Sequence, residues 1–134
     1  MAEASVKGLR FSEEHIWVGI KDKEVILGAT PWLQRQLGEV TYVGLPEIGE
    51  VLERGEPFGE IETVRTIKEL VAPISGEVLL VNLELESEPT LVNEDPMGEG
   101  WLLQIRAENP QELEELMDEE EYEQFVEGQE EDTL

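Results

Sequence analysis

The chain has 134 residues, enough for one domain with a hydrophobic core, and a formal net charge of −24. This charge argues against nucleic-acid and anionic-membrane binding, which need a basic surface. It is compatible either with a partner that carries a basic patch or with a solvated acidic surface that has no specific partner. With no cysteine and one histidine, the chain has no thiol chemistry and little room for a catalytic triad or a zinc site, so no metal site is expected.

The N-terminal residues lack both the basic flank and the apolar run of a signal peptide. No apolar stretch approaches the roughly 20 residues that a membrane-spanning helix needs. We therefore expect a soluble, cytoplasmic protein.

Short apolar runs punctuated by Gly and Pro predict a mainly β body over residues 6–106. The helical signals within and after it are local. Thr30 can cap a helix that starts at Pro31 and ends at Gly38. The predicted strands are 16–20, 24–28, 38–44, 57–64, 67–72, 76–82 and 101–106, with turns at 49–55 and 73–76.

The character of the sequence changes after Arg106. Asn109 and Pro110 form a cap-plus-proline start, and Asp118 with Glu121 resembles a capping box for a second helix. We expect two C-terminal helices over 110–127, ended by Gly128. The interpretation is a single domain over 1–128 followed by an acidic, disordered tail over 129–134.

Eight segments, taken in order, resemble the glycine cleavage H-protein family, which is related to lipoyl domains. They are GLRF (8–11), HIWV (15–18), LGEV (37–40), LPEIG (45–49), GEIETV (59–64), APISGEV (72–78), VN (81–82) and LVNEDPMGEGWL (91–102). The resemblance implies a barrel-sandwich hybrid of two small antiparallel sheets packed face to face, with short helices, two of them C-terminal.

The resemblance also implies a carrier rather than an enzyme. In the family, a lipoyl group joined to a hairpin lysine visits the glycine cleavage decarboxylase, the aminomethyltransferase and dihydrolipoamide dehydrogenase in turn. The dithiolane of the lipoyl group does the chemistry, and the protein presents it.

The hairpin of this chain departs from that pattern at the attachment point. Where the family has Glu-Ser-Val-Lys-Ala, this chain has Glu62, Thr63, Val64, Arg65 and Thr66. Arg65 therefore corresponds to the lipoyl-lysine, and a guanidinium stays protonated and cannot be acylated by a ligase. The other four residues correspond to the hairpin that a ligase recognises. Lys68 is the one lysine nearby, but it should lie about 10 Å along the strand and off the turn.

A second departure concerns the cleft that holds the lipoyl arm, to which Glu14, Ile16 and Glu69 correspond. The family has an acidic residue between the His and the Trp, where this chain has Ile16 between His15 and Trp17. An apolar residue there disfavours a charged arm. Gly44 and Met97 also replace an acidic residue and a Tyr of the family. His15 itself is interpreted as structural rather than as a general base.

Two functions stay open. The first is a non-lipoylated paralogue with no cofactor, a binding or regulatory module for the enzymes that recognise the H protein, or for lipoate ligase or transferase. In that case Arg65 either contacts an anionic group of the partner or is a solvated turn residue. The alternative is a genuine lipoate-dependent carrier whose acceptor is altered or moved to Lys68.

Overall fold

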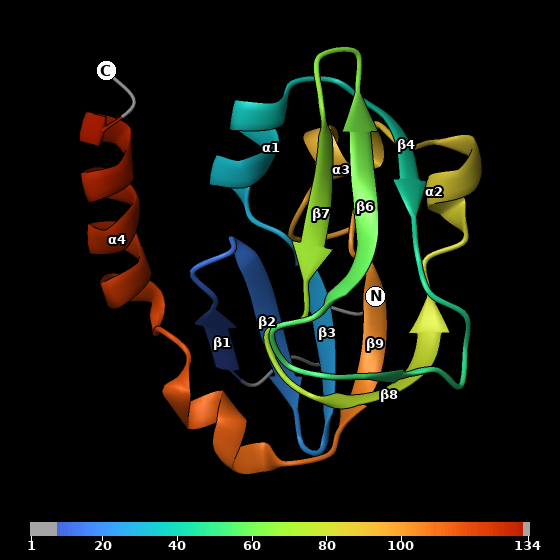
Figure 1. Ribbon diagram of the computed structural model, residues 1–134, viewed down its shortest axis with the longest axis vertical. Coiled ribbons are helices and arrows are strands. Elements are labelled where there is room, and N and C mark those ends of the chain that lie inside the picture. Colours follow the sequence, from blue (N-terminus) through green and yellow to red (C-terminus); the bar gives the residue numbers. More distant parts are fainter. Residues whose placement is uncertain (1–7, 133–134) are drawn as a thin grey trace.

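The structure, a computed structural model, describes residues 8–132, with side chains as far as Gln129. Within these described residues, nine strands form two antiparallel sheets, whose arrangement Figure 1 shows. The large sheet has the order β1-β2-β3-β9-β8-β5, and the small sheet has the order β4-β6-β7. The strands are β1 Gly8–Phe11, β2 Ile16–Lys21, β3 Glu24–Ala29, β4 Val40–Gly44, β5 Val51–Leu52, β6 Pro57–Thr63, β7 Ile67–Val71, β8 Gly76–Val81 and β9 Leu103–Ala107.

The main hydrophobic core lies between the two sheets. Ile16, Val18 and Leu27 of the large sheet are fully buried there, together with Ile61 and Leu70 of the small sheet. This confirms the mainly β prediction and the two antiparallel sheets. The arrangement is a sandwich: the described strands do not close into a barrel.

A second, smaller core covers the outer face of the large sheet. Phe11, Trp17 and Ile26 from the sheet pack there against Tyr122 and Phe125 from the C-terminal helix. Both faces of β2 are therefore buried, and the three consecutive residues Ile16, Trp17 and Val18 are each at most 2% exposed.

The predicted caps are present at the helices. The first is α1 (Pro31–Leu37), where the Thr30 hydroxyl accepts a hydrogen bond from the Leu33 amide. A 3-10 helix, η2 (Pro110–Glu115), is capped by Asn109. The capping box before α4 (Glu119–Asp132) has both of its reciprocal bonds, at 2.9 Å each. Two C-terminal helical segments are thereby confirmed.

Several boundaries differ from the prediction. Strand β1, strand β5 inside the predicted turn, and the one-turn helices α2 (Glu84–Ser87) and α3 (Leu91–Glu94) were not predicted. Elements of two to four residues are too short to show a periodicity. The described body also ends in β9 at Ala107, and residues 6–7 of the predicted body lie outside the described residues.

The expected end of the last helix at Gly128 is wrong, because α4 continues to Asp132. Glycine inside a helix costs only about 1 kcal/mol. The side chain of Gln129 accepts a hydrogen bond from His15, which favours another helical turn. Of the predicted disordered tail, 129–132 is therefore helical, and 133–134 lie outside the described residues. None of the helices in the described part of the chain is both long and apolar enough to cross a membrane.

Candidate functional site: the β6–β7 hairpin and its supports

The β6–β7 hairpin projects past the ends of both sheets, beside α1 (Figure 1). Its tip is held by Thr63, whose amide donates to the Thr66 carbonyl at 2.9 Å. The Thr63 hydroxyl accepts from the amides of Arg65 and Thr66, each at 3.1 Å. Val64 is 87% exposed. The sequence therefore builds a shaped tip that leaves one apolar side chain in solvent.

Arg65 lies at the surface but does not extend freely away from this tip. Its guanidinium folds back onto α1, where Nη2 donates to the Gln36 carbonyl at 2.8 Å. The last carbonyls of a helix have no partner within the helix and carry a partial negative charge, so a guanidinium is well suited to them. Gly38 leaves room for the contact, since a Cβ there would lie 3.2 Å from Nη2. Arg65 thus fastens the hairpin tip to the end of α1.

We predict that Arg65→Ala loosens α1 locally without unfolding the protein. Losing one net hydrogen bond should speed amide hydrogen exchange about two- to tenfold in the last turn of α1, including the Gly38 amide that bonds to Gln34. Arg106→Ala is the matched control, because Arg106 is ion-paired to Glu77 in the large sheet. Equal exchange in both variants would show that the guanidinium does not support α1.

The acidic residues predicted around the hairpin lie on its outer face. In the register of β6 and β7, Glu60 lies opposite Glu69 and Glu62 lies opposite Ile67. A hydrogen bond with the Glu62 carboxyl raises the pKa of Glu60, with burial a smaller cause in the same direction. Glu62 and Glu69 therefore belong to one acidic surface, on the side of the small sheet that faces away from the core.

Lys68 lies on the other side of β7. It is opposite the buried Ile61, and its ammonium is 3.8 Å from the carboxylate of Glu14. The side chains of Lys68 and Glu14 are 35% and 50% exposed. The ion pair joins the hairpin to the turn between β1 and β2.

The three residues that correspond to an arm cleft are not brought together. Glu14 is at the surface beside Lys68, and Glu69 is on the opposite face of β7. Ile16 has no exposed surface and packs in the core between the sheets. On the inner side of the hairpin, Glu14 is thus the carboxylate that pairs with Lys68.

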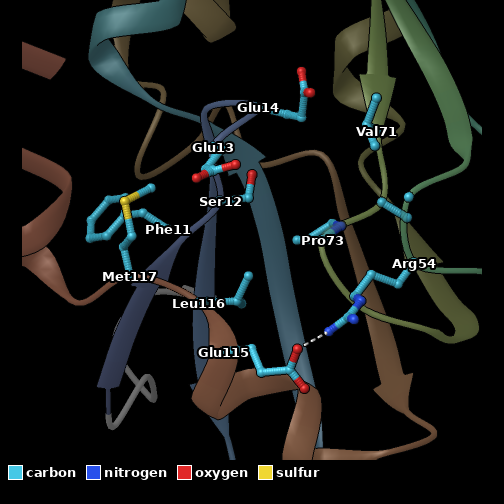
Figure 2. Close-up of a pocket in the computed structure, with 12 residues that line it drawn as sticks. Phe11, Ser12, Glu13, Glu14, Arg54, Val71, Pro73, Glu115, Leu116 and Met117 are labelled. Carbon is cyan, nitrogen blue, oxygen red and sulfur yellow. Dashed lines mark hydrogen bonds and ion pairs between the residues drawn. The ribbon is translucent and has the colours of Figure 1, made fainter. Parts of the chain in front are cut away.

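A pocket of about 460 Å³ opens at the base of the hairpin (Figure 2). The β1–β2 turn contributes Glu13 and Glu14 to its lining, and the end of β7 contributes Val71. Across it, Arg54 is paired with Glu115 at 2.9 Å. Three of these four ionisable groups are acidic, so the pocket suits a cationic or hydrogen-bond-donating group.

A buried polar cluster joins α4 to the body next to α1. His15 Nδ1 is 2.8 Å from the Tyr122 hydroxyl, and Nε2 is 2.8 Å from the Gln129 amide oxygen. Thr30 Oγ1 lies 2.7 Å from the same tyrosine hydroxyl, and Trp32 stacks on the imidazole at 4.1 Å. The Gln129 oxygen can only accept, so Nε2 donates to it, and in the neutral form of the ring Nδ1 then accepts from Tyr122. His15 is structural, as the sequence indicated.

Stability should depend on pH through this histidine. Burial lowers the pKa of His15 below its ordinary value of 6.5, although the bond to Gln129 opposes the shift. Between the folded and unfolded pKa values, the unfolded chain binds more protons. The contribution of His15 is therefore complete above about pH 6.5 and is lost as the pH falls below it.

Urea unfolding between pH 7.5 and 5.5 measures this effect. His15→Asn is the control: it removes the single histidine, and Asn tolerates the positive φ of 68° at this position. The original chain should lose more stability over this range than the variant. Parallel pH profiles would contradict the assignment.

Known proteins are similar to this chain in both sequence and fold. The family model described as "Glycine cleavage H-protein" matches residues 9–129. The chain is 45% identical over 122 residues to the glycine cleavage system H protein of Anaeromyxobacter sp. (strain K), covering 91% of this chain and 95% of that protein. It is also 45% identical over 118 residues to that of Symbiobacterium thermophilum, covering 88% and 92%.

A solved structure agrees. The glycine cleavage system H protein from Mycobacterium marinum superposes with a TM-score of 0.79 at 32% identity, covering 86% of this chain and 93% of that one. Residues 9–129, which the family model matches, include the hairpin, both sheets and most of α4. On its fold and its sequence together, the chain belongs to the glycine cleavage H-protein family.

Proposed function

We propose that the chain is a non-lipoylated member of this family, in which Arg65 occupies the lipoyl-lysine position. It serves in the cytoplasm as a binding or regulatory module for the enzymes that recognise H proteins, or for lipoate ligase or transferase. One observation carries the proposal: the side chain at the hairpin tip is a guanidinium already bonded to α1. H proteins are carriers and not themselves enzymes, so the proposed role is one of binding.

Lipoate does not fit the hairpin tip of this chain. Amide formation requires a side-chain amine that can lose its proton, and the described tip of the hairpin offers Val64, Arg65 and Thr66 instead. We therefore assign no step to a lipoyl group here.

The alternative, a carrier that is modified at Lys68, has less support. Lys68 lies within β7, opposite the buried Ile61, and its ammonium is paired with Glu14. A ligase that reads both strands and reaches the tip would find this amine on the inner side of the sheet. A working carrier at this position would need the strand or the ion pair to open.

Exposed groups on the hairpin support the proposed binding role. Val64 and Ile67 are 87% and 61% exposed, and Glu62 lies beside them on the outer face of the hairpin. A protein that docks on the hairpin of an H protein can contact these groups without any acylated lysine. Candidate partners are the glycine cleavage decarboxylase, the aminomethyltransferase, dihydrolipoamide dehydrogenase and the lipoate-attaching enzymes.

A competition experiment tests the proposal. Lipoate ligase loads an intact H protein in the presence of increasing amounts of this chain, and direct binding to each cleavage enzyme is measured in parallel. We expect the chain to slow loading or to bind at least one enzyme, and Ile67→Glu to abolish the effect. Leu80→Glu is the matched control, since Leu80 is 49% exposed on β8. Absence of both competition and binding would refute the proposal.

A further inference from the structure

A second surface, away from the hairpin tip, has the properties of a docking site. It is a groove of about 480 Å³ between the end of β4, the connection to β5, and α2. Three exposed apolar side chains line it: Tyr42, Ile48 and Leu83, which are 53%, 63% and 67% exposed. Its remaining apolar lining is formed by Val43, Leu45, Pro46, Val81 and Leu85.

The Tyr42 ring at this groove lies against Gly44. A Cβ at Gly44 would lie 3.2 Å from the Tyr42 ring and 3.3 Å from Cγ of Glu60. The ring therefore lies over the bare backbone of Gly44, beside a carboxylate.

The opposite walls are also held in place. Asn82 donates from Nδ2 to the carbonyls of Glu99 and Trp101, each at 2.8 Å, and accepts from the Glu84 amide. These bonds fix the segment that carries Leu83. The Gly49 amide donates to the Val78 carbonyl at 2.8 Å, which fixes the turn that carries Ile48. The groove is thus preformed, which lowers the entropic cost of binding.

Charge identifies the kind of occupant. The ionisable residues in the lining are Glu47 and Glu86, with no lysine or arginine among them, and Glu60 lies next to Tyr42. A second copy of this chain, which also carries a net charge of −24, would bring like charges together. Nucleic acid and anionic membranes are disfavoured for the same reason. A protein segment with basic residues beside an apolar side chain complements the groove.

We propose that this groove binds a segment of a partner protein that inserts one large apolar side chain and places Lys or Arg against Glu47 and Glu86. The anchor would cover the exposed parts of Tyr42, Ile48 and Leu83, and the charges would set orientation and specificity. The inference is independent of whether Arg65 prevents lipoylation.

A designed peptide is a direct probe. Its seven residues are a central Phe with one Leu and two Lys on each side. One matched control replaces Phe and both Leu by Ala, and the other replaces every Lys by Glu. When the probe is titrated into the ¹⁵N-labelled chain, the NMR resonances of the amides in β4, in residues 45–48 and in residues 83–86 should shift. Both control peptides should bind at least tenfold more weakly.

Variants of the chain separate specific from general binding. Leu83→Glu should lower the affinity for the probe peptide at least tenfold. Leu80→Glu should leave this affinity unchanged, because Leu80 is exposed but lies outside the groove. Equal weakening in both variants, or shifts spread over the whole acidic surface, would overturn the proposal. So would self-association of the chain that Leu83→Glu abolishes, because the occupant would then be a second copy.

Discussion

Replacing Ile16 with Glu is expected to lower the free energy of unfolding by about 4 kcal/mol or more. Truncating a buried Ile already costs about 2–5 kcal/mol, and burying an unpaired carboxyl adds to this. Ile16 has no exposed surface and packs in the core between the sheets. Its amide donates to Ser12 Oγ at 3.2 Å, which fixes the start of β2 and leaves the side chain no simple route outward.

Urea unfolding of Ile16→Glu beside Ile16→Val is the measurement. The valine variant keeps the core apolar and should lose only about 0.5–1.5 kcal/mol. If the glutamate variant were as stable as the valine variant, position 16 would be able to open to the surface. The acidic residue that the family resemblance implies there could then be restored, and one argument against a working arm cleft would disappear.

Replacing Tyr122 with Ala is expected to cost about 3–5 kcal/mol, the usual range for removing a buried aromatic ring. The ring is 7% exposed and stacks on Phe11 with centroids 4.6 Å apart. Its hydroxyl joins His15 to Thr30. Without it, α4 loses its main anchor, and proteases should cut first near Met117 and Asp118, before the helix.

The matched control is Tyr122→Phe, which keeps the ring and removes the hydroxyl. It should cost only about 1–2 kcal/mol, the effect of leaving His15 and Thr30 with an unfilled hydrogen bond. Denaturation gives the total loss, and limited proteolysis shows whether α4 is released. Equal losses in the two variants would mean that the hydroxyl rather than the stacked ring anchors the helix.

Features with local causes could be predicted from the sequence. The caps at Thr30 and Asn109 and the reciprocal Asp118–Glu121 box depend on residues a few positions apart. The hairpin strands could be predicted because their short apolar runs are bounded by Gly and Pro. The exposed tip around Val64 and Arg65 follows from that hairpin.

Features that depend on distant contacts could not be predicted. The carbonyl that Arg65 bonds to is 29 positions away. The sequence therefore predicted a guanidinium in solvent or on a partner, and not one bonded within the chain. The bond between His15 and Tyr122 spans 107 positions. The burial of Ile16 could not be predicted for a related reason. Because α4 covers the outer face of the large sheet, β2 is buried on both sides. An alternating pattern of apolar and polar residues, which would identify the buried side, is therefore missing from this strand.

The most direct test of the central claim is the intact mass of the chain after incubation with lipoate, ATP and a lipoate ligase, measured beside Arg65→Lys. We expect no change for the original chain and a gain of one lipoyl group for the variant, because the substitution places an amine at the hairpin tip. A lipoyl group on the original chain, mapped by peptide analysis to Lys68 or another lysine, would contradict the account and establish the chain as a carrier.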